Sequence, residues 1–185
     1  MKESAVFLDR DGTINEEMGY INHPSRFVLL PRTAAAIKRL NEAGVKVVVV
    51  TNQSGAARGY FPADLVEEVH ARLRQLLAAQ GAHLDGIYSC LHGPEDGCAC
   101  RKPQPGLILQ AAGELDIDLS RSYVVGDRYK DIQTGTNAGA KGIFVLTGYG
   151  RGEYQHFGHT WAVQPAHIAE DLLDAAEWII NDLKK

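Results

Sequence analysis

The chain has 185 residues, of which 45% are hydrophobic and 23% are charged. This composition is ordinary for a globular protein and excludes a disordered, collagen-like or coiled-coil chain. The 19 basic and 23 acidic side chains give a net charge of −4, so no overall positive field exists to hold nucleic acid or an anionic membrane surface. Any anion that binds must therefore be held by a local group of donors.

The N-terminal segment shows no targeting signal. Residues 1–4 lead directly into a short apolar run, and two acids follow at Asp9 and Asp11, whereas a signal peptide needs a longer apolar core and a small-residue cleavage site. The strongest apolar run, 45–50, is far too short to span a bilayer. We therefore expect a cytoplasmic protein that binds neither membranes nor nucleic acid.

Apolar runs and helix signals alternate along the chain. Strands are expected at 5–8, 45–50, 86–89, 123–125 and 142–146. Helices are expected at 33–43, 62–80, 107–115, 131–138 and 168–183, and turns at 93–105 and 149–152. Continuous apolar strands between helices are typical of a parallel sheet covered on both faces. The pattern predicts one α/β domain over 1–185, a doubly wound parallel sheet without an insertion large enough for a cap domain.

Polar residues follow directly after the predicted strands. Ligands of doubly wound sheets bind beyond the carboxyl ends of the strands, so residues at these ends are expected to surround one site. Asp9 and Asp11 follow the first strand. Asp9 can attack an electrophile covalently, and Asp11 can give a proton to the departing oxygen and later take one from water. Gly12 lets the chain turn and aim N–H groups at an anion; a turn that caps the strand is the alternative.

The other strand ends add groups suited to a phosphoryl group. The Thr51 hydroxyl can donate to a phosphoryl oxygen, and Lys102 supplies a compact positive charge; a plain turn and a solvated lysine are the alternatives. Asp9 and Asp127 offer the hard oxygen ligands that suit Mg²⁺. Asp131 can cap the next helix or join the metal site, and both roles stay open.

Four motifs in chain order resemble those of the haloacid dehalogenase superfamily of phosphatases. They are Asp9-Arg10-Asp11-Gly12-Thr13, Thr51-Asn52-Gln53, Lys102, and Gly126-Asp127 followed by Asp131. The resemblance covers about 5–147 and implies a Rossmann-like core and a Mg²⁺-dependent phosphohydrolase that forms an aspartyl phosphate on Asp9. It implies that Asp11 is the acid/base, and that Thr51 and Lys102 stabilise the transferred group. The implied Mg²⁺ ligands are Asp9, the backbone carbonyl of Asp11, and Asp127.

All three cysteines of the chain lie within one short stretch, together with a histidine. A Cys₃His set is a common closed zinc site, and its ligands would be Cys90, His92, Cys98 and Cys100. The spacing differs from the commoner Cys-x₂-Cys knuckle, and a buried cysteine with two incidental loop thiols is the alternative. Four protein ligands leave no position for a catalytic water, so a bound Zn²⁺ would be structural and would hold the loop that carries Lys102.

The same loop resembles two families within the superfamily, the heptose bisphosphate phosphatases and the histidinol-phosphate phosphatases. Its short five-residue gap between His92 and Cys98 fits the second family, whereas the segments 19–21, 51–61 and 101–106 favour the first. That family implies removal of the C7 phosphate of a heptose 1,7-bisphosphate. The reaction belongs to ADP- or GDP-heptose synthesis for lipopolysaccharide or another surface glycan, and we expect a monomer that uses Mg²⁺ and Zn²⁺.

A sugar bisphosphate carries a second anion away from the reacting phosphate. Guanidinium groups bind phosphate in a bidentate manner, so Arg58, Arg101 and Arg128 are candidates to meet it, with solvated surface arginines as the alternative. The resemblance implies substrate contacts at Glu17, Met18, Gly19, Tyr20, Thr51, Asn52, Gln53, Ser54, Arg101, Lys102 and Arg128. Arg128 departs from the lysine that the family implies at this position.

Two other classes of protein remain as alternatives. A phospho-acceptor signalling domain also uses strand-end aspartates, a threonine and a lysine, but an acid pair followed by Gly12-Thr13 fits it poorly. A zinc-stabilised nucleic-acid module is disfavoured by the net charge of −4 and the lack of a basic stripe. His70 and His83, on or just after the long predicted helix, are expected to be solvated.

Overall fold

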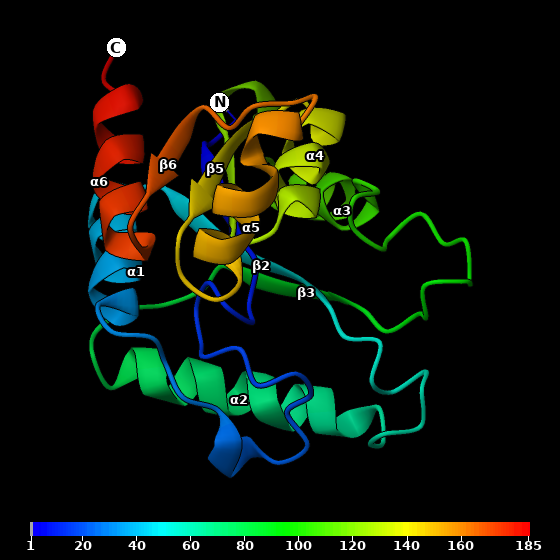
Figure 1. Cartoon of the computed structure of the whole chain (residues 1–185). Helices are drawn as coiled ribbons and strands as arrows, with labels where there is room; N and C mark the ends of the chain where they lie inside the picture. The colour runs from blue at the N-terminus through cyan, green and yellow to red at the C-terminus, as the bar shows by residue number, and fades with distance from the viewer. Residues whose placement is uncertain (1) are drawn as a thin grey trace.

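The computed structural model describes residues 2–185. A six-stranded parallel sheet has the order β3-β2-β1-β4-β5-β6 (Figure 1). Its strands are β1 (Ala5–Leu8), β2 (Lys46–Asn52), β3 (Gly86–Cys90), β4 (Tyr123–Gly126), β5 (Lys141–Val145) and β6 (His167–Ala169). From β1 the chain winds outward to β3, then crosses back to β4 and winds the other way. The expected doubly wound parallel sheet is confirmed, and its switch point lies between β1 and β4.

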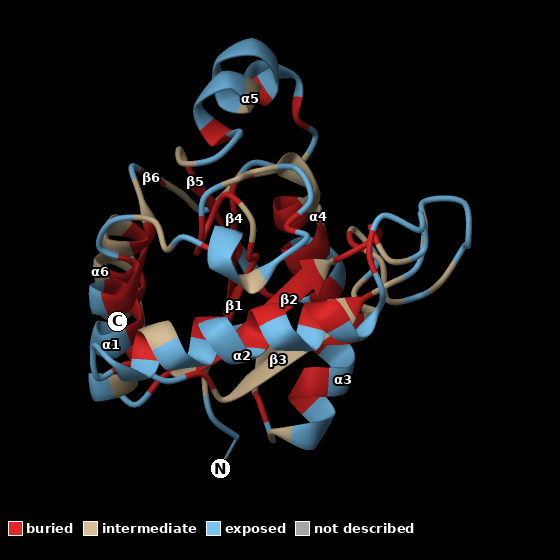
Figure 2. Ribbon diagram, turned by 90° about the horizontal axis from the view of Figure 1, so that it is seen from below, coloured by how far each residue is buried: buried red, intermediate tan, exposed pale blue. Residues whose placement is uncertain are grey.

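Helices cover both faces of this sheet (Figure 2). They are α1 (Thr33–Glu42), α2 (Asp64–Ala78), α3 (Gly106–Glu114), α4 (Tyr129–Ala138), α5 (Gly150–Phe157) and α6 (Leu172–Asp182), with short 3₁₀ turns η1 (Pro24–Arg26), η2 (Leu119–Arg121) and η3 (Gly158–Thr160). Side chains of α1, α2 and α6 share one core cluster, and those of α3 belong to another. No helix among residues 2–185 combines the length and apolar character that crossing a membrane requires.

The central strand β1 shows why the sheet is buried on both faces. Val6 and Leu8 belong to the core cluster of α1, α2 and α6, while Phe7 belongs to the cluster of α3. Successive side chains of a strand point to opposite faces, so an unbroken apolar run supplies two cores at once. The strand thereby brings Asp9 to the edge of the sheet where β4 also ends.

The C-terminal third differs from the sequence prediction in two places. The helix predicted over 168–183 is a short strand, β6, followed by a helix that begins only at Leu172, because the Asp171 carboxylate accepts hydrogen bonds from the N–H groups of Leu173 and Asp174 (3.0 Å each). The segment 149–152, predicted as a turn, instead leads into α5. A three-residue strand is too short for its periodicity to be separated from an adjoining helix.

Candidate active site

Three carboxylates and one ammonium group meet at the switch point. Asp9 follows β1, Asp127 follows β4, and Asp131 lies in the first turn of α4; one oxygen of each lies within 4.8 Å of the others. Lys102 Nζ donates to Asp9 Oδ1 at 2.8 Å and to Asp131 Oδ1 at 2.7 Å. All four residues are buried. The three aspartates come together because β1 and β4 are neighbours and both end at this edge, and Lys102 reaches them from the loop between β3 and α3.

The charges in this group do not balance without a further cation. Burial lowers the pKa of the Lys102 ammonium, but Asp131 and Asp9 more than offset this and raise its pKa above the ordinary value. Burial, with added repulsion from Asp9 and Asp131, raises the pKa of Asp127 to about 8. One ammonium among three carboxylates leaves an excess of negative charge. Hard oxygen ligands with such an excess fit Mg²⁺, so Asp9 and Asp127 are placed as the sequence prediction requires.

Asp131 serves both to cap α4 and to hold Lys102. Its Oδ2 accepts a hydrogen bond from the N–H of Arg128 at 3.2 Å, while its Oδ1 accepts from Lys102. A Cβ atom at Gly126 would collide with the Asp131 side chain, and one at Gly12 would collide with the Asp127 carboxylate. Gly12 also has a φ of +85°, a conformation that glycine adopts without strain. Both glycines therefore permit the close approach of the carboxylates.

Asp11 lies beside this group, held by three neighbouring side chains. Arg10 Nη2 donates to both carboxylate oxygens at 3.0 Å, Asn15 Nδ2 to Oδ1 at 2.9 Å and Gln53 Nε2 to Oδ2 at 2.8 Å. The same Gln53 amide donates to the Thr51 hydroxyl at 2.9 Å, which leaves the hydroxyl hydrogen free for another acceptor. The strand ends of β1 and β2 are thus connected through hydrogen bonds at the site.

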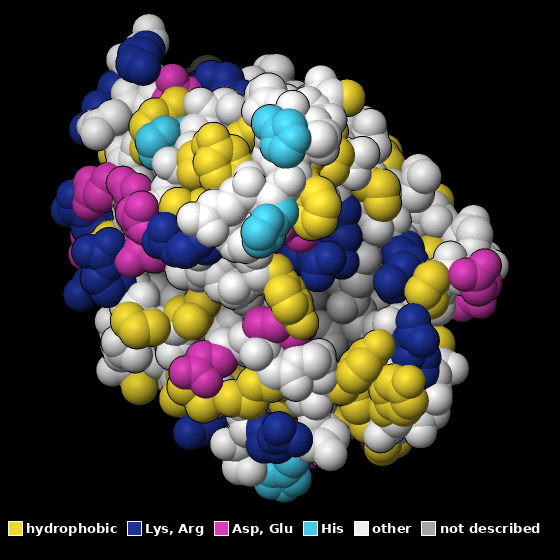
Figure 3. Space-filling model, in the orientation of Figure 1, with side chains coloured by type: hydrophobic (Ala, Val, Ile, Leu, Met, Phe, Trp, Pro, Cys, Tyr) yellow, Lys and Arg dark blue, Asp and Glu magenta, His cyan; other side chains and the backbone are white. Residues whose placement is uncertain are grey.

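A cleft of about 290 Å³ opens over Asp9 and Asp11. Figure 3 shows a hollow on one face of the molecule with Lys and Arg side chains beside it. The predicted substrate-contacting residues that line the cleft are Glu17, Gly19, Tyr20, Asn52, Ser54, Arg58, Arg101, Lys102 and Arg128. Met18 instead packs against the hydrophobic core. Thr51 and Gln53 are outside this lining, and Gln53 connects them to Asp11.

The cleft also contains two residues that are not among the predicted site residues. Lys130 and Tyr149 line its wall. Lys130 lies within the fourth motif, directly before Asp131, and that position was a usable signal. Tyr149 belongs to the segment 149–152, which the sequence indicates as a flexible turn that could border the pocket, and Tyr149 does line the cleft. In the structure its ring lies 4.8 Å from the guanidinium carbon of Arg128, which also forms an ion pair with Glu153 of α5.

Arg58 and Arg101 differ from Arg128 in their partners. Within residues 2–185, neither forms an ion pair with a carboxylate. Arg101 donates to the backbone oxygen of His92 at 3.2 Å. These two guanidinium groups therefore keep most of their donors for an anion in the cleft.

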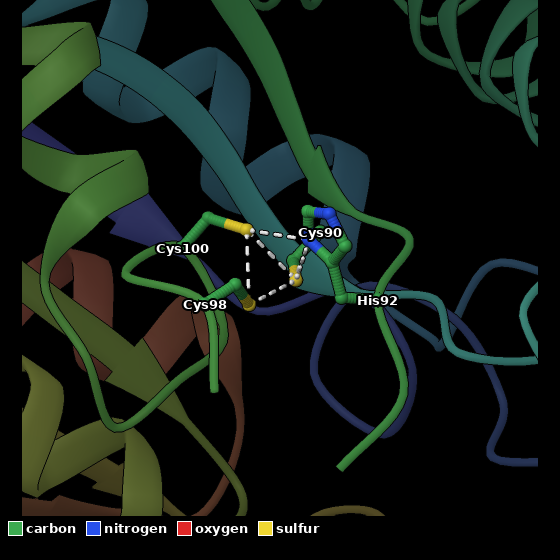
Figure 4. Close-up of side chains that lie close together, drawn as sticks. All are labelled: Cys90, His92, Cys98 and Cys100. Atoms are coloured by element: carbon green, nitrogen blue, oxygen red, sulfur yellow. Dashed lines mark hydrogen bonds between the residues drawn. The ribbon is translucent and has the colours of Figure 1, made fainter. Parts of the chain in front are cut away.

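The four residues of the predicted zinc site point toward one another (Figure 4). Their ligand atoms all lie within 4.8 Å, with sulfur–sulfur distances between 3.0 and 3.6 Å and His92 Nδ1 at 3.2 Å from Cys100 Sγ. Four ligands around a tetrahedral zinc ion, with Zn–S bonds of about 2.3 Å, stand about 3.8 Å apart. The donor set and its spacing therefore fit Zn²⁺.

The cysteine loop is connected to Lys102. Asn52, at the end of β2, accepts a hydrogen bond from the N–H of Lys102 at 3.1 Å and donates to its carbonyl at 3.3 Å. Cys100 lies two residues before Lys102. The backbone of Lys102 is thus held on one side by β2 and on the other by the cysteine cluster.

The prediction that His70 is solvated is wrong. Its side chain lies on the buried face of α2 with 3% of its surface exposed, and its Nε2 is 3.3 Å from Arg10 Nη1. The sequence held a signal for this burial, because Val66, His70, Leu73 and Leu77 recur at helical spacing on the inner face of α2. His83, in contrast, is exposed as expected.

Comparisons with known proteins agree with this geometry. A family model described as HAD-hydrolase-like matches residues 99–175. The D-glycero-D-manno-heptose-1,7-bisphosphate 7-phosphatase of Thermosynechococcus vestitus is 46% identical, over 99% of this chain and 98% of that protein. The D-glycero-beta-D-manno-heptose-1,7-bisphosphate 7-phosphatase of Bordetella bronchiseptica is 38% identical, over 96% of this chain and 98% of that protein.

A solved structure shows the same similarity in three dimensions. The crystal structure of D,D-heptose 1,7-bisphosphate phosphatase from B. bronchiseptica, complexed with magnesium and phosphate, matches with a TM-score of 0.88 and 36% identity, covering 97% of this chain and 99% of that chain. The similarity to each of these proteins covers nearly the whole of this chain. The chain therefore belongs to the haloacid dehalogenase-like phosphatases, in the family of the heptose-1,7-bisphosphate 7-phosphatases, and it is a phosphoric monoester hydrolase.

Proposed function

We propose that the enzyme removes the C7 phosphate of D-glycero-D-manno-heptose 1,7-bisphosphate in ADP- or GDP-heptose synthesis, with Mg²⁺ and through an aspartyl phosphate on Asp9. The relatives named for this substrate match over nearly the whole chain, and the B. bronchiseptica structure holds magnesium and phosphate. The observation that carries the proposal is the position of Asp9 at the cleft, 2.8 Å from Lys102 and in one group with Asp127 and Asp131.

The reaction has two displacement steps on phosphorus. An Asp9 carboxylate oxygen attacks phosphorus, and the bond from phosphorus to the sugar oxygen breaks as Asp11 gives that oxygen a proton. Asp11, now ionised, takes a proton from water; the hydroxide attacks phosphorus and breaks the bond to Asp9, which releases inorganic phosphate. Asp11 is suited to both steps because it lines the cleft beside Asp9.

Positive charge offsets the repulsion between ionised Asp9 and a phosphate dianion. Mg²⁺, held by Asp9, Asp127 and the backbone carbonyl of Asp11, would supply two charges against the phosphoryl oxygens. Lys102 supplies a third, and the free hydrogen of the Thr51 hydroxyl is a further donor. Phosphoryl transfer depends mostly on such charge stabilisation and positioning.

The rest of the cleft is suited to a sugar that carries a second phosphate. Arg58, Arg101 and Lys130 line it without a carboxylate partner within residues 2–185, so they are available to a distant anion. Burial raises the pKa of Glu17, with a smaller contribution from Asp11, and this carboxyl can exchange hydrogen bonds with sugar hydroxyls. We propose that the substrate is a small molecule and that the enzyme is a monomer.

Phosphate release from heptose 1,7-bisphosphate and from histidinol phosphate, measured side by side with Mg²⁺, tests the substrate. We expect turnover of the bisphosphate with loss of the C7 phosphate and retention of the phosphate at C1. Hydrolysis of histidinol phosphate alone would make the substrate proposal wrong and leave the mechanism standing. An Asp9→Asn variant that retained activity would contradict the mechanism itself, and a chain that fails to turn over an aryl phosphate would favour a phospho-acceptor domain.

A further inference from the structure

Arg10, between the two proposed catalytic aspartates, turns its side chain into the interior of the protein. Only 2% of its surface is exposed, and it is among the largest fully buried side chains. Its guanidinium has two polar partners, the Asp11 carboxylate and the imidazole of His70 on α2. The Phe27 ring lies 5.9 Å away. A buried charge needs such partners, but these two differ in kind, because Asp11 lines the cleft and His70 does not.

The contact with His70 defines the state of the imidazole. A guanidinium has only donors and keeps its proton in proteins, so His70 Nε2 must accept from Arg10 Nη1, at 3.3 Å. The imidazole hydrogen then lies on Nδ1, which is 3.8 Å from the Glu67 carboxylate. Burial and the Arg10 charge both favour this uncharged form and lower the pKa of His70 to about 3. His70 thus acts as a fixed acceptor that orients one edge of the guanidinium.

The opposite edge of the guanidinium orients Asp11. Arg10 Nη2 lies 3.0 Å from each carboxylate oxygen, and Arg10 Nε lies 3.3 Å from Oδ1. Asn15 also directs its amide hydrogens toward Asp11 Oδ1 and the Glu16 carbonyl. The Asn15 oxygen is left as the one buried side-chain polar atom without a partner among residues 2–185. An unpaired buried acceptor costs free energy. The Asn15 side chain therefore keeps its hydrogen bond to Asp11 although its own oxygen is left without a donor.

We propose that His70 and Arg10 are positioning residues for catalysis: His70 fixes the Arg10 guanidinium, and Arg10 holds the Asp11 carboxylate where it meets the leaving-group oxygen. The inference rests on the proposed function, in which Asp11 exchanges the proton. Arg10 is not itself a catalytic residue, because its side chain does not line the cleft. His70 lies on α2, outside all four motifs that carry the reaction.

The proposal predicts a dependence on the leaving group. A sugar alkoxide is a poor leaving group and needs the proton of Asp11, whereas the oxide of an acidic phenol departs without one. The ratio kcat/KM reports steps up to the first irreversible one, which here is departure of the leaving group. A displaced Asp11 should therefore lower kcat/KM for a sugar phosphate and leave kcat/KM for 4-nitrophenyl phosphate nearly unchanged.

The experiment compares His70→Leu, which removes the acceptor, with His70→Gln, whose amide oxygen can take the place of Nε2. We expect His70→Leu to lower kcat/KM for the sugar bisphosphate by about tenfold or more, given what misplacement of a catalytic group costs. For 4-nitrophenyl phosphate the change should stay within about threefold, because no proton transfer is needed. His70→Gln should restore the sugar bisphosphate value. Leu73→Ala, also buried in α2, is the control for loss of packing and should affect both substrates alike.

The Asp11→Asn variant tests the proposed role of Asp11 separately from that of His70. If Asp11→Asn shows the leaving-group dependence and His70→Leu does not, His70 has only a structural role and this inference is wrong. If Asp11→Asn shows no such dependence, the proposed role of Asp11 fails as well. Equal loss on both substrates in His70→Leu, without rescue by His70→Gln, also overturns the inference. Should His70→Leu fail to fold, His70→Asn, whose shorter amide cannot reach Arg10, takes its place with the same expected result.

Discussion

The Lys102 ammonium lies 2.7 Å from Asp131 and 2.8 Å from Asp9, so one buried cation joins the proposed nucleophile to the first turn of α4. The lysine reaches this position from the cysteine loop, and Asp131 from α4, which follows β4 on the other side of β1. Both are buried, and Lys102 forms an ion pair with each of the two aspartates. The lysine with a proposed catalytic role is therefore also a structural link between the two halves of the sheet.

Replacing Lys102 with alanine should lower kcat by on the order of 10²-fold or more, because one preorganised donor to the transferring phosphoryl group contributes that much. The loss should appear in samples that circular dichroism shows to be folded, since Asp131 keeps its hydrogen bond from Arg128. Steady-state phosphate release measures the effect. A fully active Lys102→Ala enzyme would exclude the proposed role of this residue.

Lys130→Ala is the matched control within the same cleft. Lys130 lines the wall but has no contact with Asp9 within hydrogen-bond distance, so kcat should change little. We expect KM for the bisphosphate to rise by about tenfold, which corresponds to the loss of one phosphate contact of roughly 1.4 kcal/mol. KM for 4-nitrophenyl phosphate, which has no second phosphate, should not move. An equal rise for both substrates would place Lys130 at the reacting phosphate instead.

Mg²⁺ should stabilise the folded protein through the carboxylate group. A ligand at 100 times its Kd adds about 2.7 kcal/mol to the free energy of unfolding, which corresponds to a Tm increase of roughly 5–10 °C for a chain of this size. Thermal unfolding with and without Mg²⁺ measures the increase. Asp127→Asn removes one ligand and should abolish most of it, whereas Asp96→Asn, on the exposed loop, should retain it. A Mg²⁺ effect of equal size in both variants would contradict the site.

Zinc should be bound in the purified enzyme at one ion per chain, as metal analysis will measure. Cys98→Ser should lose the ion. The same loop supports Lys102, so loss of zinc should displace this lysine. The activity of Cys98→Ser should therefore fall by on the order of tenfold or more, as a displacement of about 1 Å can cause. His159→Ala changes an exposed histidine outside the cluster and should keep both zinc and activity. Full activity in a zinc-free Cys98→Ser enzyme would show that the loop needs no metal.

His70 should make the protein less stable in acid. Its pKa is lowered from 6.5 to about 3 by burial and by Arg10 and Arg74. Between these two pH values His70 is protonated in the unfolded chain and uncharged in the folded chain. The stabilisation is complete above pH 6.5 and is lost as the pH falls toward 3, with a slope of up to about 1.4 kcal/mol per pH unit. Urea unfolding of the wild type between pH 7 and 5 should therefore lose about 2 kcal/mol more than His70→Gln loses. Identical slopes in both proteins would mean that His70 is not kept uncharged.

Much of the fold follows from local pattern. The sequence predicts both β2 and α2. A strand buried on both faces has a continuous apolar run, as the valines of β2 do, whereas a helix buried on one face has apolar residues at helical spacing, as α2 does. The short elements cannot be predicted from periodicity in this way. Ile168 belongs to a strand only because β5 lies beside it, and Tyr149 meets the cleft only because α5 folds back over Arg128.

By itself, the sequence determined the kinds of chemical group present and their order along the strands: the Asp9–Asp11 pair, a lysine after the third strand, and a Cys₃His set. Tertiary structure alone decided their partners. Lys102 pairs with Asp131 as well as Asp9, and Arg10 points inward to His70 instead of out to a phosphate. The reason is physical: the partner of a charged side chain depends on which distant segments enclose it, and local periodicity holds no information about that enclosure.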